Sequence, residues 1–259
     1  MVEMTQLNSP AAIYVLGIRV DGLSQQQAID RIDVIIAQYR ARNNQFPCKQ
    51  IVTVNPEFLV AAQRNRQFRR AINDAALVLP DGMGIVWATW YLRQPVPERV
   101  TGTDTLTELA RLCASRGYRL YLLGAAHGVA ELAAQRLQQL APGLQIAGTY
   151  AGSPAPMEEE AIIERIRVAQ ADILCVAYGA PAQDLWIYRN LVRLPVAVAM
   201  GVGGAFDFLS GRQRRAPRLM QSAGLEWLYR LYREPWRWRR MLALPLYAIL
   251  VLLKGHNAL

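Results

Sequence analysis

The feature that most constrains the fold is an alternation of short, β-rich apolar runs with helical stretches of about 10 to 15 residues, which continues from residue 13 to residue 200. Strands that alternate with helices in this way pair into a parallel sheet, because each helix carries the chain back across one face of that sheet. The sequence therefore predicts an α/β fold with a Rossmann-like, mostly parallel sheet and helices on both faces.

The individual elements follow from the apolar runs and from capping residues. Ser24 and Gln27 form a capping box, and Asn55-Pro56-Glu57 combines a cap, a first-turn proline and an acid, so each predicts a helix start. The predicted strands are 13–20, 51–54, 77–79, 119–123, 146–150, 173–178 and 196–200. The predicted helices are 24–42, one that begins at 55, 84–93, 104–116, 129–140, 156–170 and 182–191.

Polar residues and glycines gather where the predicted strands end. In open parallel sheets, ligands bind at the carboxyl ends of the strands. The residues found there are Thr53, Asn55, Asp81, Gly82, Gly124, Gly179 and Gly201 to Gly204. Their convergence predicts one binding cleft at that edge of the sheet.

Asp81 is the candidate for acid–base chemistry. It follows an apolar strand and precedes two glycines in the segment PDGMG. The glycines allow the backbone to approach a ligand closely, and a partly desolvated carboxylate suits a general base. The alternative is that Asp81 only caps the next helix, as Asn55 does in its own segment. Thr53, which alone is a weak signal, is placed to point into the same cleft.

The segment Gly201-Val202-Gly203-Gly204 suits diphosphate binding through backbone N–H groups, although a tight turn would explain it as well. It does not match GxGxxG, because residue 206 is Phe. The chain has no Asp-x-Asp pair, no CxxC and only two histidines. We therefore predict no metal and no cofactor. If the chain is a nucleotide-sugar enzyme, arginines and backbone dipoles must stabilise the leaving group instead, and Arg99 and the tail arginines are the candidates.

Positive charge is concentrated at the C-terminus. The chain has a formal net charge of +9, and its last 49 residues hold nine arginines and one lysine against two glutamates. Arg230, Arg233, Arg237 and Arg240 share one face if a helix continues through Pro235. Tryptophans and tyrosines interleave with them, which suits the headgroup zone of an anionic membrane. Nucleic acid and a solvated basic face are the alternatives; the adjacent apolar run favours the membrane.

That apolar run, 241–253, has 13 residues, fewer than the roughly 20 that span a bilayer, and Pro245 interrupts it. It predicts an interfacial segment, with a core helix as the alternative. The N-terminus lacks the pattern of a signal peptide, and the cysteines indicate a reducing compartment. We expect a cytoplasmic protein at the inner face of the cell membrane, with a catalytic domain over 1–213 and a helical membrane-docking tail over 214–259.

Seven segments occur in a characteristic order and spacing. They are TVNPEF (53–58), PDGMGIVWA (80–88), ERVTGTD (98–104), YLLGA (121–125), YGAPAQDLW (178–186), GVGGAFDFLSG (201–211) and RRAPRLMQSAGLEWLYRLYREPWRWRR (214–240). Together they resemble the WecG/TagA/CpsF glycosyltransferases. The resemblance covers roughly residues 13 to 240, and seven ordered motifs are far more specific than any single one.

The resemblance implies an inverting, metal-independent glycosyltransferase. Such enzymes move a sugar, often of the N-acetylmannosamine type, from a UDP donor to a polyprenyl-diphosphate-linked sugar. Their products feed wall teichoic acid, enterobacterial common antigen or exopolysaccharide. The expected partners are thus the UDP-sugar, the lipid-linked acceptor and an anionic membrane surface, without nucleic acid. A homo-oligomer would bury the apolar face of the tail away from the membrane.

The resemblance also implies roles for residues. Asp81 corresponds to the family's proposed base, and Thr53 and Arg99 complete the catalytic set. The substrate-binding residues expected from the motifs and the strand ends are Asn55, Gly82, Gly124, Gln183, Gly203, Gly204, Asp207, Arg230, Arg237 and Arg240. One departure is that the family usually has Lys and Glu around the glutamine, where this chain has Ala182 and Asp184, which removes a donor contact by that lysine.

These residues predict a single displacement. Asp81 accepts a proton from an acceptor hydroxyl, which attacks the anomeric carbon with inversion, while the N–H groups of Gly203 and Gly204 and the arginines stabilise UDP. The tail docks on the bilayer and folds over the cleft, which excludes water. The alternative is a non-catalytic peripheral membrane protein that binds nucleotide-sugars or lipid headgroups. A nucleotide-dependent oxidoreductase is disfavoured, because the glycine turn and the acid that it requires are absent.

Overall fold

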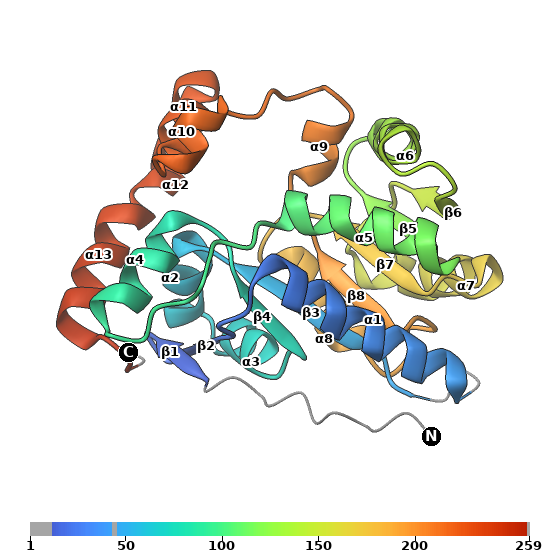
Figure 1. Cartoon of the computed structure of the whole chain (residues 1–259), viewed down its shortest axis with the longest axis horizontal. Helices are drawn as coiled ribbons and strands as arrows, with labels where there is room; N and C mark the ends of the chain where they lie inside the picture. The colour runs from blue at the N-terminus through green and yellow to red at the C-terminus, as the bar shows by residue number, and fades with distance from the viewer. Residues whose placement is uncertain (1–11, 43–45, 258–259) are drawn as a thin grey trace.

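A six-stranded parallel sheet forms the centre of the molecule (Figure 1). The computed structural model describes residues 12–42 and 46–257. The strands lie in the order β4 (Leu77–Pro80), β3 (Lys49–Val54), β8 (Val198–Gly201), β7 (Ile173–Ala177), β5 (Arg119–Gly124) and β6 (Gln145–Tyr150). All five residues of β7 are buried, as expected for a parallel strand covered on both faces. The α/β prediction is confirmed.

The prediction of one strand over 13–20 is wrong. The segment is a two-stranded antiparallel hairpin of β1 (Ile13–Val15) and β2 (Ile18–Val20), separate from the main sheet. Leu16 and Gly17 form its turn with φ of 52° and 71°. A two-residue turn with positive φ at both positions matches the twist of a hairpin, but leucine gives no sequence signal for such a turn.

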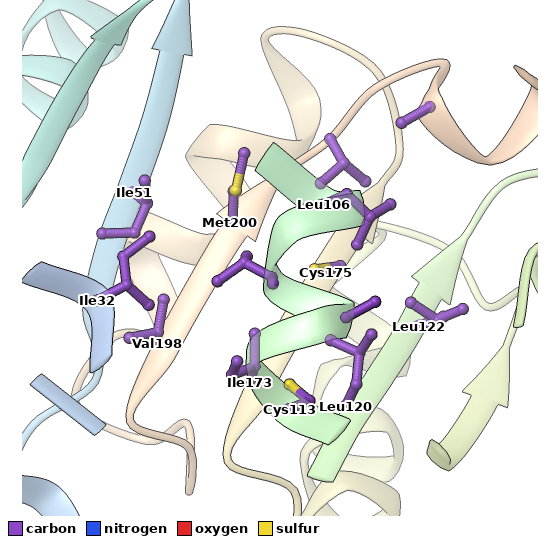
Figure 2. Packing of buried hydrophobic residues seen from close by; sticks show 14 of the residues in the cluster. Ile32, Ile51, Leu106, Cys113, Leu120, Leu122, Ile173, Cys175, Val198 and Met200 are labelled. Atoms are coloured by element: carbon purple, nitrogen blue, oxygen red, sulfur yellow. The ribbon is translucent and has the colours of Figure 1, made fainter. Parts of the chain in front are cut away.

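One face of the sheet is covered by four helices, which are α1 (Gln25–Ala41), α5 (Gly102–Arg116), α6 (Val129–Leu140) and α9 (Ala205–Leu209). Figure 2 shows part of this core. Ile32 of α1 lies beside Ile51 and Val198, and Leu106 and Cys113 of α5 lie over the neighbouring strands. The helix stripes and the strands thus bury one continuous apolar cluster.

The opposite face carries two groups of helices. At the β3–β4 end these are α2 (Pro56–Arg64), α3 (Arg66–Asn73) and α4 (Met83–Tyr91). Over β7 they are α7 (Glu159–Ala169), which follows the short turn η1 (Pro156–Glu158), and α8 (Ala182–Asn190). Helices on both faces leave the carboxyl ends of the strands as the open edge, where a ligand can reach the backbone.

Capping residues set the helix starts that matter for the site. Ser24 and Gln27 form the predicted capping box, with the Gln27 N–H donating to Ser24 Oγ at 3.2 Å. Asn55 caps α2 with its side chain, as predicted. Thr101 caps α5, so this helix begins at Gly102, ahead of the predicted start at residue 104. The earlier start brings a helix terminus to the open edge of the sheet.

The tail is a chain of short helices, stacked along one side of the molecule (Figure 1). These are α10 (Arg218–Ser222), α11 (Glu226–Arg233), the 3-10 turn η2 (Pro235–Arg237), α12 (Trp238–Met241) and α13 (Ala243–Lys254). The condition for a common face of the four arginines, a helix that continues through Pro235, is not met. Proline lacks the N–H that a helix interior needs, and Glu234 before it leaves helical angles, with φ −132° and ψ 72°.

The apolar run of the tail packs on the body by one side only. In α13, Tyr247 and Val251 are buried in the cluster that contains α2, and Tyr247 Oη donates to the carbonyl oxygen of Gly84 at 3.2 Å. Leu253 is 75% exposed. Pro245 does not interrupt this helix, because it lies in the first turn, where no N–H is used. Along the described part of the chain, no helix has the length and apolar character to span a bilayer.

Candidate active site

Two adjoining pockets open at the carboxyl ends of β3, β4 and β8, and the tail closes one side of each. The polar pocket has a volume of about 370 Å³ and is lined by Thr53, Asn55, Asp81, Gln183, Gly203, Gly204, Asp207, Arg230, Arg237 and Arg240. The apolar pocket has a volume of about 940 Å³ and is lined largely by α4 and by the tail. Both pockets are lined by Asn55, Asp81, Arg230 and Arg237, so they meet at these residues.

Asp81 lies at this junction, at the end of β4. Its Oδ2 accepts a hydrogen bond from the Gly102 N–H at 3.3 Å. Burial raises the pKa of Asp81 to about 6; the Gly102 N–H and the charges of Arg99 and Arg230 lower it, and the charge of Glu226 raises it. A carboxyl group with a pKa near 6 is ionised at pH 7 and is basic enough to take a proton in a transition state.

Gly102 allows α5 to come close to β3. A Cβ atom on residue 102 would lie only 3.2 Å from Thr53 Oγ1, so a larger residue would push the helix away from the strand. The close approach brings the first N–H of α5 to Asp81 and leaves the buried Thr53 in the wall of the polar pocket. The positive end of the helix dipole therefore faces the site.

Gln183 joins two strand-end loops. Its Oε1 accepts the N–H of Gly179 at 3.1 Å and the N–H of Gly203 at 3.0 Å. The expectation that the Gly203 N–H binds a diphosphate is corrected, because that N–H already donates to Gln183. Gly201 has no room for a side chain, since a Cβ would lie 2.6 Å from Gln183 Nε2. Close packing thus explains why residue 201 is a glycine. Gly204 lines the polar pocket.

Arg230 and Arg237 form a positive wall on the tail side of the polar pocket. The Arg230 guanidinium lies 4.7 Å from the centre of the Phe208 ring, and Arg237 pairs with Glu234 at 2.9 Å. Each arginine has a buried Nε without a hydrogen-bond partner among the described residues. Burial lowers the pKa of Arg230, and so does the charge of Arg237. Two neighbouring, partly buried cations repel each other, and a bound diphosphate would relieve this repulsion.

The broken helix separates the four tail arginines. Arg240 lies at the rim of the polar pocket and pairs with Glu57 of α2 at 2.7 Å. Arg233 is exposed and lines neither pocket. The predicted common face therefore fails for Arg233, whereas Arg230, Arg237 and Arg240 all reach the polar pocket.

Glu226 and Arg215 connect the tail to the body, and sequence reasoning did not single out either residue. Glu226 of α11 pairs with Arg99 at 3.3 Å. Arg215 pairs with Asp104 of α5 at 2.5 Å and approaches Glu226 at 3.7 Å. Arg99 therefore lies in the wall of the apolar pocket with an acidic partner from the tail. The sequence did contain a signal for Glu226, because an acid in a strongly basic segment is unusual.

The remaining expected site residues differ in position. Asp207 lines the polar pocket, and burial raises its pKa. Gly82 lines the apolar pocket with φ of 103°. Gly124 lines neither pocket and is a correction: a Cβ there would lie 2.8 Å from the backbone of Ala177, so the glycine allows close strand packing.

Relatives of known name match most of the chain. A protein of Bacillus spizizenii is 37% identical over 202 residues, which is 78% of each chain. A protein of Bacillus subtilis is 35% identical over 80% of each chain, and one of Staphylococcus aureus is 30% identical over 95% of this chain and 94% of its own. All three are named N-acetylglucosaminyldiphosphoundecaprenol N-acetyl-beta-D-mannosaminyltransferase.

The family model described as "Glycosyl transferase WecG/TagA/CpsF family" matches residues 13–258. This range includes the sheet, both pockets and all the tail arginines that line them. With an α/β fold and relatives named as glycosyltransferases, the chain belongs to the WecG/TagA/CpsF glycosyl transferase family.

Proposed function

We propose that this protein transfers N-acetylmannosamine from UDP to N-acetylglucosamine on a polyprenyl diphosphate, by an inverting and metal-independent reaction. The observation that carries the proposal is the position of Asp81, between a polar pocket walled by arginines and a second, apolar pocket. The names of the relatives support this sugar and this lipid-linked acceptor.

The reaction is one displacement. A hydroxyl oxygen of the acceptor sugar attacks the anomeric carbon of the donor while the Asp81 carboxylate takes the hydroxyl proton. The bond between the anomeric carbon and the diphosphate oxygen breaks, and UDP leaves with the electron pair. Because the attack comes from the face opposite to UDP, the configuration at the anomeric carbon inverts.

Arginines stabilise the charge that develops on UDP. Arg230 and Arg237 line the polar pocket from the tail with partly buried side chains, and Arg240 lies at its rim. Arginine binds phosphate oxygens through paired N–H groups and keeps its charge, so it can take the part that a metal plays in other sugar transferases. In this proposal, Thr53 and Asn55 contact the donor from the strand ends.

The tail brings the enzyme to its lipid-linked substrate. Trp236 and Trp238 are largely exposed beside the basic residues Arg239 and Arg240. Tryptophan and arginine together suit the headgroup region of an anionic bilayer. We place the protein at the inner face of the cell membrane, bound peripherally through residues 214–259.

The test is a UDP-release assay with purified protein, a panel of UDP-sugars and N-acetylglucosamine on a short polyprenyl diphosphate. We expect release with UDP-N-acetylmannosamine that requires the acceptor, persists in a metal chelator and is lost in Asp81→Asn. An inverted linkage in the product, identified by NMR, completes the assignment. If Asp81→Asn turned over like the wild type, Asp81 would not be the base. If UDP failed to bind in calorimetry, the donor assignment would be wrong.

A further inference from the structure

The apolar pocket has two chemically different ends. The end at the strands is lined by Asp81, Arg99 and Arg230, which carry charge. By contrast, every lining residue that α4 and α13 contribute is uncharged, and they include Trp87, Leu244 and Ala248. Glu57 and Glu226 also line the charged end, so this end holds charges of both signs. A ligand that fills the whole pocket therefore has a polar or charged head and a hydrocarbon body.

The outer end of this pocket opens among exposed aromatic residues. Trp90 of α4 is 72% exposed, and Trp87 and Tyr91 on the same helix are also exposed. Three large aromatic side chains on one short helix form an apolar surface that a soluble protein normally covers. Trp and Tyr side chains suit the interface between water and a bilayer, so the mouth of the pocket matches a membrane surface.

We infer that the apolar pocket binds the first isoprene units of the acceptor lipid, between α4 and α13, with the acceptor diphosphate at the charged end of the pocket. The inference rests on the proposed function and adds a site for the lipid chain to it. A volume of about 940 Å³ lies near the upper limit of the ~300–1,000 Å³ typical of small-molecule sites. It accommodates the beginning of a polyprenyl chain, whose remainder stays in the bilayer.

The residues that line the two pockets indicate which substrate each pocket binds. The donor nucleotide needs hydrogen-bonding groups along its length, and the polar pocket supplies them through Asn55 and Asp207. Neither α4 nor α13 offers a charged group to the apolar pocket. In this inference the two substrates reach Asp81 from different pockets, which adjoin at this residue.

A bulky side chain introduced on α13 can fill the apolar pocket while its polar residues stay unchanged. Ala248 lines it from α13, whereas its neighbour Ile249 is exposed and lines neither pocket. Ala248→Trp should raise the KM for a farnesyl-linked acceptor by about tenfold, because the chain loses its buried contacts. With an acceptor that carries a methyl group in place of the lipid, kcat and KM should not change. Ile249→Trp, the matched control, should resemble the wild type with both acceptors.

A binding experiment separates this inference from the proposed function. A photoactivatable farnesyl diphosphate should label α4 or α13 in the wild type, and Ala248→Trp should reduce the labelling. Labelling there without any sugar transfer would support the lipid site and overturn the proposed function. Transfer with a KM that depends neither on the chain nor on Ala248→Trp would overturn the lipid site alone. If phosphatidylglycerol vesicles displaced the label, the pocket would be a general lipid surface. This result would also overturn the inferred site for the acceptor lipid.

Discussion

The sheet body and the tail are held by different forces. The body buries continuous apolar clusters on both faces of its sheet. Among the described side chains of the tail, the buried apolar ones are Ala216, Met241, Tyr247 and Val251. Partly buried apolar residues of α13, such as Leu246 and Leu250, pack against the core as well. Ion pairs add further contacts, such as those of Arg215 with Asp104 and of Arg240 with Glu57.

The two regions therefore differ in their contribution: the body stabilises the folded protein, and the tail closes the site. Burial of a large core gives lasting stability, whereas exposed ion pairs contribute about 0–1 kcal/mol each and weaken in salt. The helices α11 and η2 bury no residue, whereas α13 is packed in the core. The part of the tail before α13 can therefore leave the body, which would admit the nucleotide and let this part bind the membrane. In the proposed reaction, the body supplies the base, Asp81, and the tail supplies the arginines that stabilise the leaving group.

Removal of residues 212–259 is the largest test of this comparison. Transfer should fall by at least about 10³-fold, because Arg230 and Arg237 are both lost and a single charge-stabilising donor can contribute 10²–10³-fold. The body should still unfold in one cooperative thermal transition, measured by circular dichroism. A truncated body without cooperative unfolding would show that the tail belongs to the core, and the comparison would fail.

A pair of tail variants sharpens the comparison further. Arg230→Ala should lower kcat by about 10²-fold, because the proposed reaction loses a partly buried guanidinium that stabilises the leaving group. Arg233→Ala, in the same helix but outside both pockets, should stay within about twofold. The measurement is UDP release at saturating acceptor. Equal losses in both variants would mean that the tail acts only through its overall charge on the membrane.

A third test concerns the body alone. Asp184 is 1% exposed, and burial raises its pKa from 3.8 to about 7. The folded protein therefore keeps a proton that the unfolded chain releases, so stability declines as the pH rises from about 4 to about 7. Asp184→Asn cannot ionise and should be more stable by on the order of 2 kcal/mol at pH 8, with no gain near pH 4. Urea unfolding at both pH values measures this, with the exposed Asp30→Asn as control; a gain that did not change with pH would contradict it.

The smallest expected effect concerns one ion pair between tail and body. Glu57→Gln removes the partner of Arg240 and should weaken tail docking by at most about 1 kcal/mol. Hydrogen exchange in α12 should become faster at low salt, and the difference from the wild type should shrink in high salt. If the difference persisted in high salt, contacts other than this ion pair would hold α12.

The sequence predicted the sheet well because its signals are local. Each strand is a short apolar run, and Asn55 and Ser24 mark helix starts within a few residues. The hairpin was missed because Leu16 adopts positive φ without any residue-type signal. The break in the tail had a signal in Pro235, but the arginine spacing suggested a continuous helix.

The site was predictable only in part. Thr53, Asn55 and Asp81 were found because the ends of parallel strands share one edge. Contacts between distant segments gave no such signal, since Arg99 and its partner Glu226 are 127 residues apart. For the same reason, the sequence could not reveal that Gln183 occupies the Gly203 N–H. The resemblance named individual residues, but their pairing needed the fold.

The central claim is that a base in the body works under charges from the tail, and the pH profile of kcat/KM, which reports groups of the free enzyme, tests it most directly. The acid limb of the wild type should lie near pH 6, because Asp81 must be ionised to accept a proton. Glu226→Gln should move this limb to lower pH, since the Glu226 charge raises the pKa of Asp81, and Arg230→Ala should move it to higher pH. A limb that stays in place in both variants, or a wild-type limb near pH 4, would contradict the account.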